Sequence, residues 1–149
     1  MIVKEMDRSE CMALLQATRL GRLGCASGGQ PYVVPITYAA DGNNLYSFSL
    51  VGRKIDWMRQ NPKVCVQVDE FGEGREWRSV IAYGRFEELP DRIGSKGQRE
   101  HAWSLLSRDL EWWEPGALKP VGQAPAQHLF YRIAVEEVTG RHGFPDPDD

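Results

Sequence analysis

The sequence predicts a mainly β (α+β) fold: an antiparallel barrel with peripheral helices. Three observations support this prediction. Six segments are rich in β-branched and aromatic residues or alternate apolar with polar ones, turn signals separate several of them, and few helical patterns lie between. The chain has 149 residues, of which 42% are hydrophobic and 26% charged, and its composition shows no internal boundary. We therefore expect a single domain over 1–149, large enough to bury a core without disulfides or metal.

The first elements are a helix and a strand. Asp7-Arg8-Ser9-Glu10 has the spacing of a capping box, with Asp7 as N-cap of a helix that fades near Thr18. A strand is expected over 20–26. It ends at the turn signal Ser27-Gly28-Gly29-Gln30.

A second strand is expected over 31–40, with Pro35 inside it. Because proline cannot donate to a sheet ladder, this strand should have a free edge or a local break at that point. Asp41-Gly42-Asn43-Asn44 is a hairpin turn signal, and 45–50 is the returning strand.

The second half of the chain repeats this alternation of strands and helices. A short helix should start around Gly52 and end at Asn61, because Pro62 disfavours helical backbone before it. The remaining elements expected are strands over 63–70, 76–89 and 128–139, a helix over 95–110, and a connector over 118–127.

Composition excludes several classes of function. The formal net charge is −3 and no long basic run occurs, so we expect no nucleic-acid partner. No apolar run approaches a membrane span and the first residues lack a signal-like segment, so we expect a cytoplasmic protein. Three widely spaced cysteines and three scattered histidines predict no metal site and no disulfide framework.

The segment most suited to binding a ligand is Gly52-Arg53-Lys54, where a hydroxyl-bearing strand runs into a helix. Helix N-termini present free N–H groups and the positive end of the dipole, which suits a phosphate. Two cations there oppose the dipole unless an anion neutralises them, and Gly52 allows close approach to the backbone. The alternative is that Arg53 and Lys54 are solvated surface charges.

Two further features have competing interpretations. Trp112-Trp113 is either an aromatic cluster packed on the barrel or a lid, with Trp113 over a bound ligand. Asp69-Glu70 is either a carboxylate pair for acid–base chemistry or a pair of solvated residues at a strand end.

An ordered set of short motifs spans nearly the whole chain and resembles the pyridoxamine 5′-phosphate oxidase-like superfamily of FMN-binding split-barrel proteins. The motifs are Gly21-Arg22-Leu23-Gly24; Gln30-Pro31-Tyr32-Val33-Val34-Pro35-Ile36-Thr37-Tyr38; Leu45-Tyr46 with Gly52-Arg53-Lys54-Ile55; Asn61-Pro62-Lys63-Val64; Trp77 with Ser79-Val80-Ile81 and Gly84; and Arg132-Ile133 with Thr139-Gly140.

The resemblance implies a split β-barrel and a set of residues that bind FMN. Arg53 and Lys54 would hold the phosphate at Gly52, and the strand Ser47-Phe48-Ser49 would lie along the ribityl chain and phosphate. The strand Val33-Val34-Pro35-Ile36-Thr37 would border the flavin ring. Ser79 would reach the flavin, and the side chain of Trp77 would line one wall of the site. The resemblance also implies a homodimer with the flavin at the subunit interface.

The chain departs from true pyridoxamine phosphate oxidases, because it lacks their Arg-rich C-terminal signature and has Tyr32 where they begin their Arg-led flavin strand. Phe48 stands where nitroimidazole-resistance-like members often carry histidine.

The resulting hypothesis is a flavin-dependent oxidoreductase of unknown substrate, with a nicotinamide nucleotide or small oxidised compound as redox partner and no catalytic residue identified. The alternative is a non-catalytic module that stores or senses flavin or haem, with His142 as haem ligand. Deazaflavin is an alternative to FMN.

Overall fold

The computed structural model describes residues 1–90, 92–108 and 129–148, and within them it is dominated by one antiparallel sheet. The helices are α1 (Arg8–Ala17), α2 (Arg53–Gln60) and α3 (Lys96–Leu106), the last preceded by a 3₁₀ turn, η1 (Ile93–Ser95). The strands are β1 (Ile2–Glu5), β2 (Leu20–Ser27), β3 (Gln30–Thr37), β4 (Ala39–Asp41), β5 (Asn44–Ser49), β6 (Lys63–Phe71), β7 (Trp77–Leu89) and β8 (Leu129–Phe144).

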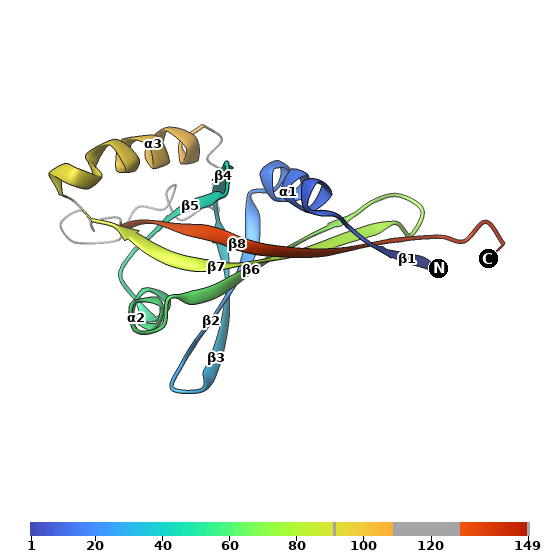
Figure 1. Ribbon diagram of the computed structural model, residues 1–149, viewed down its shortest axis with the longest axis horizontal. Coiled ribbons are helices and arrows are strands. Elements are labelled where there is room, and N and C mark those ends of the chain that lie inside the picture. Colours follow the sequence, from blue (N-terminus) through green and yellow to red (C-terminus); the bar gives the residue numbers. More distant parts are fainter. Residues whose placement is uncertain (91, 109–128, 149) are drawn as a thin grey trace, which may run out of the picture.

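The order of the strands shows how the sheet curls into a barrel. The path runs β3-β2-β6-β7-β8-β5-β4, and β1 pairs separately with β8. Its two ends, β3 and β4, are consecutive in the chain and separated only by Tyr38. The sheet therefore turns back on itself, and the prediction of a mainly β barrel with peripheral helices is confirmed (Figure 1).

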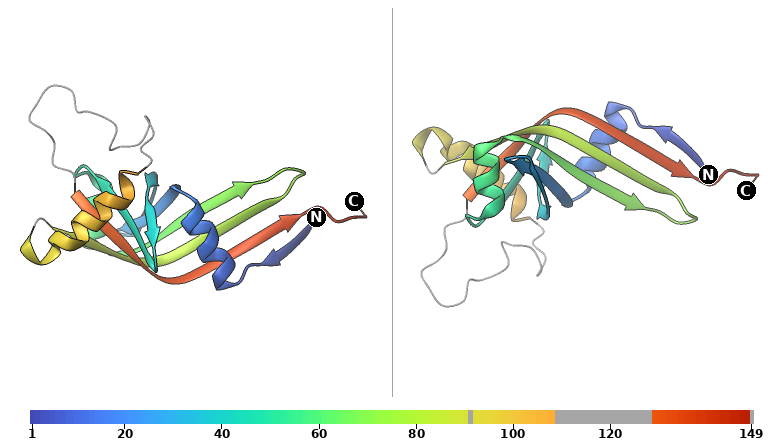
Figure 2. Two further views of the ribbon diagram at one scale, coloured as in Figure 1. Left: turned by 90° about the horizontal axis from the view of Figure 1, so that it is seen from above. Right: turned by 90° about the horizontal axis from the view of Figure 1, so that it is seen from below.

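The helices lie on different sides of this sheet. Figure 1 shows α1 and α3 above the β5–β8 region and α2 below it, beside β2. Both views of Figure 2 show the β6–β7 hairpin and the β8–β1 pair extending away from the end that carries α2 and α3. The molecule thus has a barrel end with helices and a long arm in which β6, β7, β8 and β1 form one continuous part of the sheet.

The core fills the barrel from alternate positions of its strands. Val64, Val66 and Val68 of β6 are buried, as the alternation predicted. A second, smaller apolar cluster lies under α3 and includes Phe48. Fully buried large side chains are Tyr38, Tyr131, Phe48, Leu15, Leu23, Leu45, Ile55, Met58, Leu106, Ile133 and Val66.

Several local predictions are confirmed. Asp7 is the N-cap of α1, and its carboxylate accepts a hydrogen bond from the Glu10 amide at 2.8 Å. The C-cap of α2 is Asn61, directly before Pro62. Pro35 lies in β3, at one end of the strand path, where a missing donor is tolerated.

Two predicted strands were wrong in extent, and one strand was missed. The segment 31–40 is not one strand, because the chain leaves β3 after Thr37 and joins β5 through β4. β1 was not predicted, since four residues that include two charges carry little strand signal. The last strand continues beyond Thr139 to Phe144, because Gly140 and Gly143 mark close packing in the strand and not its end.

The predicted helix over 95–110 corresponds to α3, which ends at Leu106. The predicted connector over 118–127 and His128 lie outside the described residues. Within residues 1–90, 92–108 and 129–148, no helix is long and apolar enough to cross a membrane.

Candidate functional site

The N-terminus of α2 is built for close approach of a ligand. Gly52 is its N-cap in extended backbone, with no side chain to bond the first turn. The Asp56 amide closes that turn on the Gly52 carbonyl at 3.0 Å. The amides of Arg53 and Lys54 precede this bond, so they belong to the first-turn donors that a helix cannot satisfy itself.

Arg53 and Lys54 lack anionic partners in the described part of the chain. Neither forms an ion pair with a carboxylate there, whereas Arg59, in the last turn of the same helix, pairs with Glu88 at 2.8 Å. Arg53 lies over the Tyr32 ring, 5.7 Å from its centroid. Lys54 is half-buried, and this burial lowers the pKa of its ammonium group. An anion at this turn would stabilise both charges.

The predicted flavin strand presents its residues in two directions. Val33 and Pro35 of β3 are exposed, Val33 at 67%, whereas Val34 and Ile36 pack toward the core. Thr37, at the end of the strand, is buried, and its hydroxyl has no hydrogen-bond partner among the described residues. An orphaned buried hydroxyl costs free energy, so it suits a bound hydroxyl or a water molecule.

The hydroxyl-bearing strand β5 is engaged within the protein. Ser47 is buried, and its hydroxyl donates to the Thr37 carbonyl at 2.5 Å. The Ser49 hydroxyl donates to the Leu50 carbonyl at 2.8 Å. Phe48 packs edge-on against Trp103, with ring centroids 6.4 Å apart. This strand therefore stabilises the barrel beside β3 and leaves Ser49 next to the turn before Gly52.

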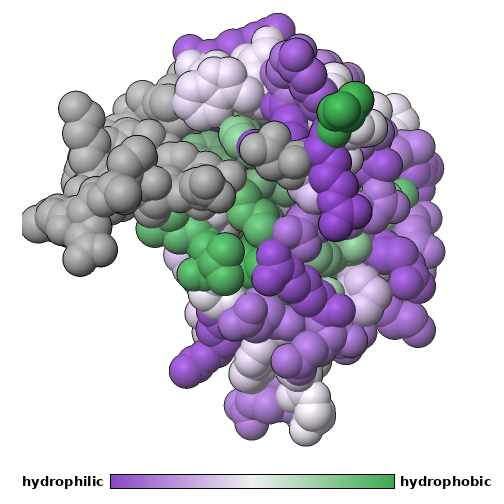
Figure 3. All heavy atoms as spheres, turned by 90° about the vertical axis from the view of Figure 1, so that its left-hand side faces the viewer, coloured by the Kyte–Doolittle hydropathy of each residue, from purple (hydrophilic) through white to green (hydrophobic). Residues whose placement is uncertain are grey.

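The surface around α2 combines polar and apolar character. Leu50 and Val51, which directly precede Gly52, are both exposed. Figure 3 looks at the end of the molecule that carries α2 and α3, and shows hydrophobic residues gathered in the middle of this face among polar ones. A ligand with a phosphate and an apolar ring matches this combination.

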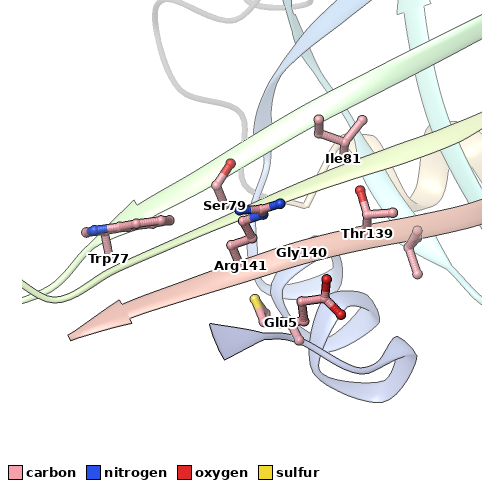
Figure 4. Close-up of a pocket in the computed structure, with 9 residues that line it drawn as sticks. Glu5, Trp77, Ser79, Ile81, Thr139, Gly140 and Arg141 are labelled. Atoms are coloured by element: carbon pink, nitrogen blue, oxygen red, sulfur yellow. The ribbon is translucent and has the colours of Figure 1, made fainter. Parts of the chain in front are cut away.

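Trp77 and Ser79 lie elsewhere, in a hollow of about 600 Å³ that we call the β7–β8 hollow. Its lining is Glu5, Met6, Trp77, Ser79, Ile81, Val138, Thr139, Gly140 and Arg141. Ser79 faces Arg141 and Ile81 faces Thr139 across the β7–β8 ladder. Figure 4 shows these side chains on one side of the two strands, with Trp77 at one end and Glu5 on β1.

The two sets of predicted residues lie at different ends of the molecule. Lys63 follows α2 closely and pairs with Arg85, whereas Phe71 pairs with Trp77 at the far end of the β6–β7 ladder. The eight residue steps from Arg85 to Trp77 span about 26 Å of extended strand. Figure 1 shows the same separation, with α2 on the left and the β6–β7 turn on the right.

Sequence reasoning missed Thr139 and Arg141 as lining residues, because the last strand was expected to end at Thr139. No simple alternation marked them: odd-numbered positions of β8 are buried over 131–135 but exposed at 139 and 141, because the pairing with β7 shifts register between these segments. The described residues contain no group of three metal-ligating side chains. Trp113, predicted as a lid, lies outside the described residues.

The remaining candidates have ordinary partners. His101 Nε2 lies 2.6 Å from Asp41, and His142 Nε2 lies 2.7 Å from Glu76. Asp69 pairs with Arg22 at 3.5 Å, on the strand face opposite to that of its neighbour Glu70. Because adjacent strand residues face opposite sides, the Asp69-Glu70 sequence does not form a carboxylate pair.

Comparison with known proteins identifies relatives over nearly the full chain. A protein of Rhizobium meliloti (strain 1021), named only as uncharacterized, is 51% identical over 144 residues, which are 95% of each chain. The crystal structure of a FAD-binding protein from Mesorhizobium loti is 54% identical, covers 96% of this chain and 99% of its own, and superposes with a TM-score of 0.84.

A FAD and haem binding protein from Mycobacterium smegmatis shares the fold. It is 21% identical, covers 96% of this chain and 76% of its own, and has a TM-score of 0.67. The family model described as pyridoxamine 5′-phosphate oxidase matches residues 7–142. The chain therefore belongs to the pyridoxamine 5′-phosphate oxidase family, and its barrel is the split barrel of these relatives.

Proposed function

We propose that this protein binds a flavin nucleotide and holds its phosphate at the N-terminus of α2. The observation that carries the proposal is the pair Arg53 and Lys54, which lies in the first turn of a helix and has no described carboxylate partner. The orphaned Thr37 hydroxyl supplies a polar contact for the ribityl chain nearby. The 54% identical relative, which is named as FAD-binding, supports a flavin as the ligand.

FMN was the expectation from the sequence, and FAD is named as a ligand of two of the relatives, those of Mesorhizobium loti and Mycobacterium smegmatis. The two share the flavin ring, the ribityl chain and the first phosphate, so the residues of α2 suit either one. Mass spectrometry of the cofactor released from purified protein distinguishes FMN, FAD and a deazaflavin. Haem would give a Soret band, and it would have to displace Glu76 from His142 Nε2 if that histidine were its ligand.

We further propose that two copies form a homodimer that brings the two sets of residues together. Arg53 and Lys54 of one protomer would face the β7–β8 hollow of the other. A two-fold axis repeats such a contact twice, so each dimer would hold two equivalent sites. The exposed apolar residues Val33 and Tyr83 lie on strands β3 and β7 and are suited to burial in such an interface.

The activity we propose is flavin-dependent oxidoreduction of a small molecule, with a nicotinamide nucleotide as a candidate donor. The flavin supplies the redox chemistry when bound, and this chain binds the phosphate, orients the ring and excludes water. Anaerobic bleaching of the bound flavin by NADH or NADPH would support an enzyme. A flavin that is never reduced by either donor would favour a storage or sensing module.

The phosphate site is tested by a double variant, Arg53→Ala with Lys54→Ala. Each lost charge-assisted hydrogen bond is worth about 1.5–3 kcal/mol, so flavin nucleotide affinity should fall by at least about 100-fold. Riboflavin, which has no phosphate, should bind the double variant and the wild type equally. Titration by flavin fluorescence measures both.

Arg59→Ala is the matched control, because it removes a cation from the same helix that is already paired with Glu88. Its flavin affinity should equal that of the wild type. Unchanged FMN and FAD affinity in the double variant would place the phosphate elsewhere and refute the proposal.

A further inference from the structure

We propose that Gln67 fixes the Ser79 hydroxyl as a hydrogen-bond donor into the β7–β8 hollow, so that this wall recognises an acceptor atom of the ligand. The inference rests on the proposed flavin function, because it specifies what the hollow offers to the flavin ring. Gln67 and Asp69 are positioning residues in it, since both act on the ligand through Ser79.

The geometry is a short relay across three strands. Gln67 Nε2 on β6 lies 3.1 Å from Asp69 Oδ2 and 3.1 Å from Ser79 Oγ on β7. Arg22 on β2 pairs with Gln67 in the ladder, and its guanidinium lies 3.5 Å from Asp69 Oδ1. Asp69 is also the ladder partner of Ser79. The relay therefore runs from Arg22 through Asp69 and Gln67 to Ser79.

The orientation of the Gln67 amide follows from chemistry. An ionised carboxylate can only accept hydrogen bonds, so Gln67 must turn its NH₂ group, and not its carbonyl oxygen, toward Asp69. The same nitrogen then donates its second proton to Ser79 Oγ. Arg22 lies beside the same carboxylate, so the Oδ1 atom of Asp69 has its own donor and Oδ2 is left for Gln67.

The Ser79 O–H group is therefore still free to donate a hydrogen bond. A hydroxyl that accepts a hydrogen bond from an amide still carries an O–H, and that O–H must point away from the donating nitrogen. The Ser79 hydroxyl donates no hydrogen bond to another of the described residues. Ser79 lines the β7–β8 hollow, so the free donor is available to a molecule bound there.

The neighbours of Ser79 favour the same class of ligand atom. Arg141, its ladder partner, is exposed and forms no ion pair with a described carboxylate, and Trp77 adds an indole face. Glu5 lies on the other strand bordering the hollow, β1. A planar ring that turns a carbonyl oxygen or an unprotonated ring nitrogen toward Ser79 and Arg141 can accept from both, whereas an N–H edge in that orientation would face the Arg141 guanidinium, which only donates.

The experiment compares Ser79→Ala, Gln67→Met and Ser79→Thr in the full chain. We would measure the dissociation constant of the oxidised flavin nucleotide and the midpoint potential of the bound flavin, with thermal melting to verify folding. Ser79→Ala should weaken binding about fivefold, the effect of one net hydrogen bond. If only one redox state gains that bond, the potential shifts by about 20 mV, at about 30 mV per tenfold for two electrons.

Gln67→Met should shift affinity and potential in the same direction as Ser79→Ala, because it frees the hydroxyl to rotate. Ser79→Thr keeps the hydroxyl and should retain wild-type values. Ser104→Ala, which removes an exposed hydroxyl on α3, is the matched control and should change neither quantity.

Two results would overturn the inference. Wild-type affinity and potential in Ser79→Ala would show that the hydroxyl meets no ligand atom. An effect in Ser79→Ala without one in Gln67→Met would show that the relay does not position the hydroxyl. A wild-type protein that binds no flavin would instead overturn the proposed function, and this outcome is distinguishable because it precedes any variant.

Discussion

Replacing Gly143 with alanine tests the packing that forms one wall of the β7–β8 hollow. Gly143 is buried opposite Trp77 in the β7–β8 ladder. A Cβ atom at this position would overlap Trp77 Cε2 and Nε1, and would lie 2.7 Å from Trp77 Cζ2. The indole must therefore move, or the two strands must separate.

The magnitude follows from two opposing contributions. Forcing an extra methyl group into a packed site costs about 1–3 kcal/mol. Glycine within a strand is itself less favourable than alanine by about 0.5–1 kcal/mol. In the wild-type background the overlap should dominate, and Gly143→Ala should destabilise the protein by up to about 2 kcal/mol. At about 3 °C per kcal/mol for a domain of this size, the melting temperature should fall by several degrees.

In a Trp77→Ala background the overlap is absent, so the same substitution should stabilise the protein by about 0.5–1 kcal/mol. Urea unfolding of the wild type, the two single variants and the double variant measures this change of sign as a coupling energy. The reasoning is refuted if Gly143→Ala has the same effect in both backgrounds.

Three further predictions concern the charge at α2, the close packing of Gly84 in β7 against β8, and a buried hydroxyl. Because burial lowers the pKa of Lys54, its charged form destabilises the fold at neutral pH, and this cost disappears as pH rises from the folded pKa toward the unfolded value. Lys54→Met should therefore raise the melting temperature of the ligand-free protein at pH 7, with a smaller gain near pH 10.5, while lowering flavin nucleotide affinity. Gly84→Ala should cost about 3 kcal/mol in urea unfolding, because its Cβ would meet the Ala134 carbonyl oxygen, which belongs to the paired backbone and cannot move aside. Tyr38→Phe should cost about 1–2 kcal/mol in the same assay, because it leaves the Leu15 carbonyl without the Tyr38 hydroxyl that donates to it at 2.7 Å; an unchanged unfolding midpoint would contradict this.

The sequence predicted correctly those helix and strand features that depend only on neighbouring residues. The Asp7 cap, the alternation of β6 and the end of α2 before Pro62 depend on neighbouring residues only, so the sequence contains the whole cause. The extent of β8 depends instead on distant partners. Gly140 looks like a strand terminator, but it is required because a Cβ there would lie 2.7 Å from Cys11 Sγ of α1.

In the candidate site, too, the residues that are contiguous in sequence were predicted, and those placed by pairing between distant strands were not. Gly52, Arg53 and Lys54 were predicted as one turn, because contiguous residues form it. The separation of Trp77 and Ser79 from that turn could not be predicted, since it depends on how far the β6–β7 ladder extends from α2. The relay through Gln67 was not found either, although the alternation of β6 already placed Gln67 and Asp69 on one face.

Strand β8 pairs with β5, β7 and β1, and it is the last of the described strands in chain order. During synthesis these three partners leave the ribosome before residues 129–144 do, so each exposes a row of unpaired backbone groups in the meantime. A truncated chain that ends before residue 129 would thus keep these strand edges unpaired. Such a fragment should aggregate or recruit chaperones. A chain that lacks only β1 would leave just four residues of β8 without a strand partner on that side, so it should aggregate less.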